Sequence, residues 1–410
     1  VSKGAKASVI GKIRDDGQYI VHNDGEEIVN ASAKEVTRGF LYDREFENPN
    51  LSFSEPDLPL SKDLGKTLLE ILAHENIACR EPIYEKYDKQ VQGRVNVESG
   101  VADSGVLTPF NSTDYPKEIR KVGIALSTDH NPRYSMISPY WGGVNAVVEA
   151  MRNVASVGAT PHAITDCLCY GNPEKPKQMW EFVEGTRGIS DACNAITLKD
   201  NPSYPTPIIA GNVSFYNESK NGPIPPSPIV SCLGRLKDID YVLPMHFQSS
   251  GSDILMVGER KDELGGSIYY QLLGELGANV PKPDFVEVRS QIFAITDCAE
   301  GGLILSCHDI SDGGIATSIA EMTFRKNIGC LVKIPGDLQV HKILFSETGG
   351  FVIETKKENT ESVIKVFKNH GLNASKIGET GGEYIQLNET VKIKVHEARH
   401  RWENGLREKL

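Results

Sequence analysis

The feature that most constrains this chain is an alternation, from about Ile119 onward, of short apolar runs with longer segments of helical periodicity. Short runs rich in branched aliphatic residues indicate buried strands, and apolar residues spaced three and four positions apart indicate helices. Strands that alternate with helices predict an α/β domain. The predicted strands are Val122–Leu126, Ala163–Cys169 and Pro207–Phe215, and the predicted helices are Val144–Val157 and Gln178–Asn194.

A second block with the same alternation begins near Asp253. The two blocks are divided near residues 237–250, so we expect two α/β (α+β) domains, at residues 109–237 and 238–410. The predicted elements of the second block are strands Ile254–Val257, Leu303–Cys307 and Phe351–Glu354, and helices at Ser267–Leu276, from Gly313-Gly314 onward, and at Thr360–His370.

The first hundred residues have a different pattern. Alternating runs at Ala7–Ile13, Tyr19–His22 and Glu27–Val29 flank two Asp-Gly turns, which is typical of β-hairpins. Glu47–Leu60 is rich in proline and is interpreted as a linker, and a helix is expected at Leu64–Ile77. We therefore expect residues 1–46 to be a small β tail from a preceding domain and residues 47–108 to be a linker with a helix. Since the chain starts without methionine, we expect a piece of a longer protein.

Charge and composition argue against several classes of protein. The 44 basic and 55 acidic residues give a net charge of −11, which argues against nucleic acid or an anionic membrane as the main partner. No apolar run approaches the ~20 residues of a membrane span. The eight cysteines form no CxxC pair and have no zinc-like spacing. We expect a soluble, cytoplasmic protein with reduced thiols. No nucleophile elbow is present, so a nucleophilic hydrolase or glutaminase is not expected.

Two polar clusters follow predicted strands and carry charged side chains. Thr128–Tyr134 combines short acidic and amide side chains with an arginine, which suits phosphate or metal–phosphate binding, although an Asx turn with a surface ion pair is equally consistent with it. His308–Gly314 places two carboxylates ahead of a glycine pair, which suits either Mg²⁺ or a helix cap. The charged candidates in these clusters are Asp129, Arg133, Asp309 and Asp312.

A polar stripe runs along the helix predicted at Val144–Val157. Its members fall within about a quarter of the helix circumference, and apolar residues occupy the rest. The stripe is either a solvated face or the lining of a polar site, and the pattern alone does not decide between them. The stripe consists of Asn145, Glu149, Arg152, Asn153 and Ser156.

Two further clusters, Thr165–Cys167 and Ala210–Ser214, are expected at the ends of their strands. In open α/β sheets, ligands bind outside the carboxyl ends of the strands. Gly211 would let a ligand approach the backbone, Asn212 offers an oxygen that suits Mg²⁺, and Ser214 could donate to a substrate oxygen. Each cluster taken alone is also consistent with an ordinary turn. A last polar turn, Phe345–Gly350, is interpreted as a cap.

These runs closely resemble the phosphoribosylformylglycinamidine synthases, also called formylglycinamide ribonucleotide amidotransferases. The resemblance covers essentially the whole chain and is to the small, separate synthetase subunit of purine biosynthesis. The runs that carry it are Thr128–Tyr134, Gly142–Val157, Thr165–Trp180, Gly211–Glu218 and Leu305–Gly314.

The resemblance implies a fold and a position in a longer protein. The family has two similar halves, each an A-type domain followed by a B-type domain, as in aminoimidazole ribonucleotide synthetase. This chain resembles the second half, preceded by the end of the first half's B-type domain. The loop that carries the family's catalytic histidine has no counterpart here, so no catalytic residue is expected in this chain.

The resemblance also implies a reaction and its participants. The family amidates formylglycinamide ribonucleotide with ATP, Mg²⁺ and ammonia from a glutaminase partner. The expected partners are the missing first half, the glutaminase, a small accessory subunit and the ribonucleotide substrate. By resemblance, Asp166 and the Gly211 N–H contact ATP, Asn212 binds Mg²⁺ and Ser214 contacts the substrate. A second nucleotide, ATP or ADP, is expected in a pseudosymmetric pocket with a structural role, which Asp129, Arg133, Glu149, Asp309 and Asp312 would form.

Two alternatives stay open from the sequence. One is a sister enzyme of the superfamily, such as aminoimidazole ribonucleotide synthetase or selenophosphate synthetase, although these lack the runs Asp166–Glu174 and Gly211–Glu218. The other is a nucleotide-binding structural half without activity of its own. Nucleotide binding together with an ammonia-dependent ATPase assay would distinguish a structural half from an enzyme.

Overall fold

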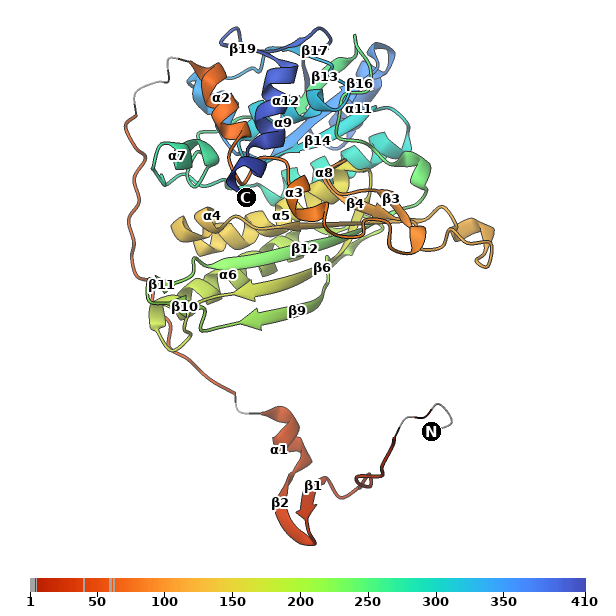
Figure 1. Ribbon diagram of the computed structural model, residues 1–410, viewed down its shortest axis with the longest axis vertical. Coiled ribbons are helices and arrows are strands. Elements are labelled where there is room, and N and C mark those ends of the chain that lie inside the picture. Colours follow the sequence, from red (N-terminus) through yellow and green to blue (C-terminus); the bar gives the residue numbers. More distant parts are fainter. Residues whose placement is uncertain (1–3, 5, 40, 59–60, 62) are drawn as a thin grey trace. The chain divides into compact units, whose positions relative to one another are not determined.

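The computed structural model describes residues 4, 6–39, 41–58, 61 and 63–410 (Figure 1). The chain divides into a small unit, Val1–Glu45, and a large unit, Phe46–Leu410. In the described residues, no helix is long and apolar enough to cross a membrane.

The small unit contains one hairpin and one short helix. Strands β1 (Gln18–Asn23) and β2 (Glu26–Ser32) pair antiparallel across the predicted Asp24-Gly25 turn, and helix α1 (Ala33–Arg38) follows. The strand predicted at Ala7–Ile13 is wrong, because the described residues there have no regular structure. Val9 and Ile10 are 94% and 99% exposed. An alternating pattern forms a stable strand only where a partner strand covers its apolar face.

The first sheet of the large unit has six strands: β3 (Val95–Val97), β4 (Gly105–Leu107), β5 (Gly123–Asp129), β6 (Thr160–Cys169), β9 (Ile208–Ser214) and β12 (Ser227–Leu236). Their order is β3-β4-β5-β12-β6-β9, and only β6 and β9 are parallel. The predictions of β5, β6 and β9 are confirmed, whereas β12 was not predicted although it joins β5 to β6.

Three helices connect strands of this first sheet: α4 (Pro132–Ile137) and α5 (Pro139–Ser156) lie between β5 and β6 in the chain, and α6 (Pro176–Ala195) follows β6. Helix α5 begins where Ser138 accepts a hydrogen bond from the Trp141 N–H and Pro139 occupies the first turn. It packs on β5 and β12 on one side and on α8 (Phe285–Glu300) and β14 (Ser306–Ile310) on the other (Figure 1). The wide apolar arc seen in the sequence therefore serves two layers.

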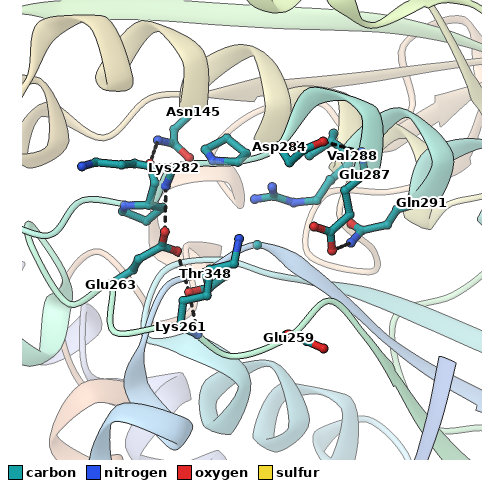
Figure 2. Close-up of a pocket in the computed structure, with 14 residues that line it drawn as sticks. Asn145, Glu259, Lys261, Glu263, Lys282, Asp284, Glu287, Val288, Gln291 and Thr348 are labelled. Carbon is teal, nitrogen blue, oxygen red and sulfur yellow. Dashed lines mark hydrogen bonds between the residues drawn. The ribbon is translucent and has the colours of Figure 1, made fainter. Parts of the chain in front are cut away.

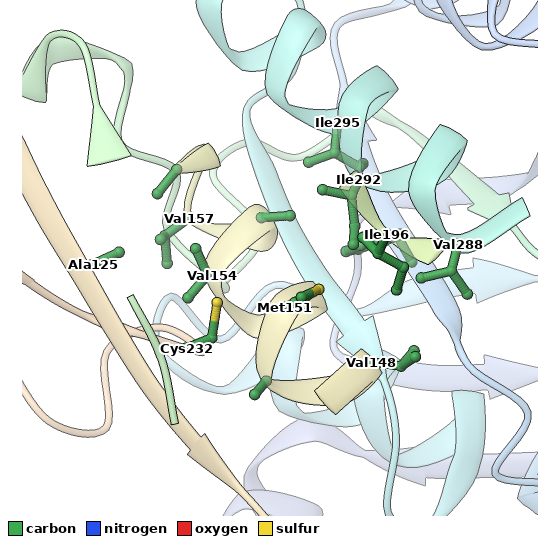
Figure 3. Close-up of a cluster of buried hydrophobic side chains, with 14 of the residues drawn as sticks. Ala125, Val148, Met151, Val154, Val157, Ile196, Cys232, Val288, Ile292 and Ile295 are labelled. Carbon is green, nitrogen blue, oxygen red and sulfur yellow. The ribbon is translucent and has the colours of Figure 1, made fainter. Parts of the chain in front are cut away.

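The core between these layers is continuous. Val148, Met151 and Val154 of α5 lie beside Ile292 and Ile295 of α8, and all five are fully buried (Figure 3). Each such side chain contributes about 1.5–3 kcal/mol relative to an exposed position. This packing holds the polar edge of α5 in a fixed position.

The second sheet has seven strands: β13 (Asp253–Val257), β14, β15 (Cys330–Val332), β16 (Gly350–Thr355), β17 (Ala374–Thr380), β18 (Tyr384–Leu387) and β19 (Val391–Lys394), in the order β14-β16-β13-β17-β15-β18-β19. Leu255 and Val257 belong to the core under α8 and α11 (Thr360–Asn369), and Ile254 and Met256 belong to a second core. Helices α2 (Leu64–Leu72), α9 (Gly314–Phe324) and α12 (Val395–Asn404) enclose that second core. The sheet is covered on both faces.

The remaining elements are short and differ from the prediction mainly at their ends. Helix α7 (Ile268–Leu272) stops before Gly274, whose φ of 76° turns the chain, so the helix predicted to reach Leu276 is too long. The others are α3 (Glu81–Tyr84), α10 (Val340–Phe345), β7 (Thr197–Leu198), β8 (Asn201–Pro205), β10 (Glu218–Ser219), β11 (Gly222–Pro223) and the 3-10 turns Val91–Gly93, Lys117–Ile119, Ile239–Tyr241, Lys357–Asn359 and Arg407–Lys409.

Candidate functional site

The polar ends of β5 and β14 meet at one cavity of about 310 Å³, which we call the acidic cavity. It joins Thr128–Tyr134 to His308–Gly314, two clusters that are far apart in the sequence. Its lining is rich in carboxylates and contains a single arginine. The lining residues are Asn76, Ile77, Arg80, Asp103, Thr128, Asp129, His130, Glu149, Asn153, His308, Asp309, Ser311, Asp312 and Glu321.

Helix α5 contributes its polar stripe to this cavity. Nε of Arg152 lies 3.7 Å from Oδ2 of Asp309, and its Nη2 lies 3.8 Å from Oε2 of Glu149. The Asn153 amide donates to Oδ2 of Asp129 at 3.3 Å. Arg152 and Glu149 are buried. The stripe is thus not a solvated face: Glu149 and Asn153 line the acidic cavity, and Asn145 and Arg152 line a second cavity described below.

The turn from β14 into α9 depends on its glycine pair. Gly313 and Gly314 have φ of 78° and 71°, in the region that favours glycine. A Cβ on Gly314 would lie 2.7 Å from the Leu344 carbonyl oxygen. The Asn131 amide donates to Oδ1 of Asp312 at 3.1 Å, which ties this turn to the start of α4. The pair therefore shapes the cavity wall.

Glu347, in the polar turn before β16, supports the same wall. Its carboxylate accepts hydrogen bonds from the Gly313 N–H at 2.7 Å, the Ile268 N–H at 2.9 Å and the Tyr134 hydroxyl at 2.5 Å. Burial raises its pKa to about 8. The predicted capping role of this turn agrees with these contacts.

His308 lies between two carboxylates. Its Nδ1 is 2.8 Å from Oδ1 of Asp103, and its Nε2 is 3.0 Å from Oε2 of Glu321. Burial by itself would lower the pKa of His308, but the two carboxylates outweigh it and hold the pKa well above its ordinary value. Oδ2 of Asp103 also accepts from the Ser156 hydroxyl and the Asp309 N–H. Both ring nitrogens of the imidazole are therefore engaged.

The carboxylates of the cavity are crowded and short of positive charge. Burial, and then repulsion from its neighbours, raises the pKa of Asp129 to about 8 and that of Asp309 to about 7. Burial also raises the pKa values of Glu149 and Asp312. Ligand atoms of Asp103, His308 and Asp309 lie within 4.8 Å of one another. Several carboxylate oxygens around one space fit a hard cation such as Mg²⁺.

Arg133 does not reach the acidic cavity. Its guanidinium donates to the Gly266 carbonyl at 3.2 Å and to the Glu275 carbonyl, because α4 turns away from the cavity after Asn131. The sequence grouped Arg133 with the other four candidates, whereas the structure does not bring it to the lining of this cavity. Arg80, which lines the cavity, and Arg152, which lies beside Glu149 and Asp309, supply the nearby positive charge.

The clusters around Asp166 and Gly211 lie in the carboxyl-terminal parts of strands β6 and β9, and Ser214 is the last residue of β9. The parallel register pairs Asp166 with Gly211 and Cys167 with Asn212. A Cβ on Gly211 would lie 2.7 Å from Oδ1 of Asp166, so the glycine leaves room for this carboxylate. Burial raises the pKa of Asp166.

The side chains of these strands point to both faces of the sheet. Because successive residues alternate, Asn212 faces the side opposite Asp166. Its amide nitrogen lies 3.4 Å from Sγ of Cys167. The Ser214 hydroxyl donates to the Asn217 amide oxygen at 3.3 Å. We call this region, Asp166–Cys169 with Gly211–Ser214, the β6–β9 edge. It is separate from the acidic cavity.

A second small cavity lies where Arg152 meets the loop Pro281–Asp284 (Figure 2). Figure 2 shows that some of its polar side chains are paired: Glu263 accepts from the Lys282 N–H at 3.0 Å and from the Thr348 hydroxyl at 2.7 Å. The Asn145 amide donates to the Pro281 carbonyl at 2.8 Å. This cavity is a small polar space between helix α5 and the elements around helix α8.

Two family models match the large unit. The description of the first is "AIR synthase related protein, N-terminal domain", over residues 103–236, and that of the second is the C-terminal domain of the same family, over residues 249–387. A curated relative from Methanothrix thermoacetophila, "Phosphoribosylformylglycinamidine synthase subunit PurL", is 43% identical over 100% of this chain. The chain belongs to the AIR synthase related protein family, and over its whole length it is similar to phosphoribosylformylglycinamidine synthase subunits.

Solved structures of this synthase family share the fold. A structure titled "T. maritima PurL complexed with FGAR" has a TM-score of 0.62 at 17% identity, covering 82% of this chain and 53% of that one. Another, "T. maritima PurL complexed with ATP", has a TM-score of 0.59 at 18% identity, covering 82% and 51%. The chain spans about half the length of these proteins and 53% of the curated relative.

The structure also contains site residues that sequence reasoning missed. Asp103 lies between β3 and β4, outside every motif singled out from the sequence, and Glu321 lies in the middle of α9. Both are recognised only because they meet His308 in space. No spacing rule connects residues so far apart in the chain.

Proposed function

We propose that this chain is the second half of a phosphoribosylformylglycinamidine synthase. The whole enzyme would amidate formylglycinamide ribonucleotide with ATP and ammonia. The observation that carries the proposal is 43% identity over the full chain to a protein of that name. A related structure titled with FGAR supports the substrate, and one titled with ATP supports the nucleotide.

In this reaction the glycinamide carbonyl oxygen takes the γ-phosphoryl group of ATP, and ammonia then displaces phosphate at that carbon, so the formyl group is kept. Mg²⁺, when bound, would offset the charge that builds up on the phosphoryl oxygens. We propose that Asp166 and the Gly211 N–H contact ATP, that Asn212 binds Mg²⁺ and that Ser214 contacts the substrate. Asn212 and Ser214 lie on one face of the β6–β9 edge, which supports placing Mg²⁺ and the substrate together there, whereas Asp166 lies on the other face.

The catalytic histidine of the reaction is assigned to the missing first half. This half would therefore orient ligands and not transfer protons. Holding two reactants in line can supply about 7–11 kcal/mol of the barrier, so a positioning role of this kind is substantial. Glutaminase and accessory subunits are proposed partners, and the relative's name describes it as a subunit. The division into an A-type domain at 109–237 and a B-type domain at 238–410 is part of the same proposal.

The acidic cavity is proposed as a second, structural site for ADP or ATP with Mg²⁺. Asp129, Glu149, Asp309 and Asp312 would hold the metal; burial raises the pKa values of these four carboxyl groups, and a bound cation would favour their charged forms. Arg133 has no part in this site. If the chain is isolated from its first half, this cavity makes it a nucleotide-binding structural half, which is the second candidate function.

The test is reconstitution. The verified 410-residue chain is assayed for product with ammonium, ATP and FGAR, alone and with the first half of the subunit added. We expect no turnover from the chain alone and restored turnover from the pair. Substantial turnover by the chain alone would contradict the split active site. If the pair does not use FGAR although both halves are folded and associated, the proposed reaction is wrong.

A further inference from the structure

The β6–β9 edge contains a pair of thiols that the proposed reaction does not use. Cys167 and Cys169 are two residues apart on β6, so their side chains point to the same face of the sheet. Their Sγ atoms lie 3.9 Å apart. The other six cysteines, all outside this edge, are buried. These two thiols are the half-buried pair of the chain.

The spacing of these sulfur atoms matches a metal site. Two thiolates on one tetrahedral zinc, with Zn–S bonds of about 2.3 Å, lie about 3.8 Å apart. Neighbouring residues on an extended strand need no backbone movement to present this geometry. Asn212 also lies beside the pair, with its amide 3.4 Å from Sγ of Cys167. A rotation of that amide by 180° would present its oxygen to the same point.

We infer that Cys167 and Cys169 form a bidentate thiolate site for a soft divalent cation of the zinc group. On binding, each thiol loses its proton to solvent and two metal–sulfur bonds form. A cation that takes both sulfurs gains affinity, because the second bond forms at high effective concentration.

This site differs in chemistry from the Mg²⁺ site proposed at Asn212. Mg²⁺ prefers oxygen ligands, whereas thiolates select soft cations. Because Asn212 lies against Cys167, the two cations would compete for one space. That competition rests on the proposed function, whereas binding of the soft cation to the thiol pair does not.

The test uses Cd²⁺ as the probe on the reduced, chelator-treated chain. We expect one Cd²⁺ per chain, with thiolate-to-cadmium charge-transfer absorbance, and displacement by Zn²⁺ but not by excess Mg²⁺. Cys167→Ser and Cys169→Ser should each lower the affinity by at least about 100-fold. Cys79→Ala, which removes a cysteine outside this edge, is the matched control and should retain full affinity.

Three outcomes would overturn the inference. These are the absence of a stoichiometric charge-transfer signal in the parent chain, retention of affinity within threefold in Cys169→Ser, and equal loss in Cys79→Ala. Thermal unfolding of each variant checks that it is folded, and both serine variants lie at half-buried positions that tolerate the change. The measurement needs no turnover, so its result is independent of the reconstitution test above.

Discussion

The acidic cavity and the β6–β9 edge differ in how much of their environment this chain supplies. The cavity is lined by residues of β5, β14, α5 and α9 and of the loops beside them, and several hydrogen bonds join its polar groups to one another. At the edge, β9 pairs only with β6 among the described strands, and Gly211 and Asn212 are exposed. Substitutions in a site whose groups are hydrogen-bonded to one another should lower the stability of the fold, whereas substitutions in an open site should mainly change ligand binding and turnover. The predictions below test that difference.

The largest effect is expected at the edge, in the whole enzyme. Asn212→Ala should lower kcat by about 10²–10³-fold. The substitution removes a proposed ligand of the Mg²⁺ ion, which would stabilise the charge that develops in the transition state. The free energy of unfolding should change by less than about 0.5 kcal/mol, since the side chain is exposed. Steady-state kinetics and thermal unfolding check this, with Ser219→Ala as the control. Parallel losses of activity and stability would mean that Asn212 is a structural residue.

In the wall of the acidic cavity, the effect should be on stability. Gly314→Ala introduces a Cβ at 2.7 Å from the Leu344 carbonyl oxygen at a φ of 71°, so we expect a loss of about 2–4 kcal/mol. Gly302→Ala is the matched control, because its φ is also positive but no atom lies within 4 Å of the new Cβ. It should cost only about 1 kcal/mol. Equal losses in urea unfolding would contradict a tight wall.

The next largest effect is on nucleotide binding, which should distinguish the acidic cavity from the β6–β9 edge. ADP with Mg²⁺ at about 100 times its dissociation constant should stabilise the isolated chain by about 2.7 kcal/mol. Asp309→Asn should abolish that gain, and Asn212→Ala should leave it unchanged. The reason is that the proposed site in the acidic cavity is formed by this chain alone, whereas the site at the β6–β9 edge is proposed to need the first half as well. Calorimetry and thermal shift measure both. Loss of the gain in Asn212→Ala alone would place the nucleotide at the edge.

The smallest effect is a pH dependence that Mg²⁺ removes. In the folded chain the pKa of Asp129 is raised to about 8 and that of Asp309 to about 7. Between the ordinary pKa of an aspartate and these raised values, the folded chain therefore binds more protons than the unfolded chain. Stability should therefore fall as the pH rises from about 5 to about 8, by a few degrees in Tm. Mg²⁺ should stabilise more at the upper end. A Tm that rises over this range without Mg²⁺ would contradict the crowded carboxylates.

The comparison also explains what the sequence could predict. Strands β5, β6, β9, β13 and β16 follow local apolar patterns, and their prediction is confirmed. Strand β12 carries a similar pattern but includes Pro228 and Gly234, which weaken it locally, and only its pairing with β5 and β6 establishes it. Prediction from the local sequence pattern fails for a strand that forms only because it pairs with its neighbours.

The site was partly predictable for the same reason. Asp129, Glu149, Asp309 and Asp312 stood out in short polar runs, and the structure brings all four to one cavity. Arg133 has the right chemistry in the same run, but its direction depends on how α4 turns. Asp103 and Glu321 gave no local signal. Residue type and spacing identify candidates, whereas side-chain direction depends on tertiary packing.

The unpaired side of β9 has a consequence for handling and synthesis of this protein. Ile208, Ile209 and Val213 are 45%, 64% and 48% exposed on a strand whose outer backbone groups have no partner strand in the described residues. Such an edge is a template for aggregation, which proteins avoid by covering it. A covering segment on the same polypeptide would be present at about millimolar effective concentration from the moment of synthesis. Such a segment would therefore protect this strand before any ligand binds.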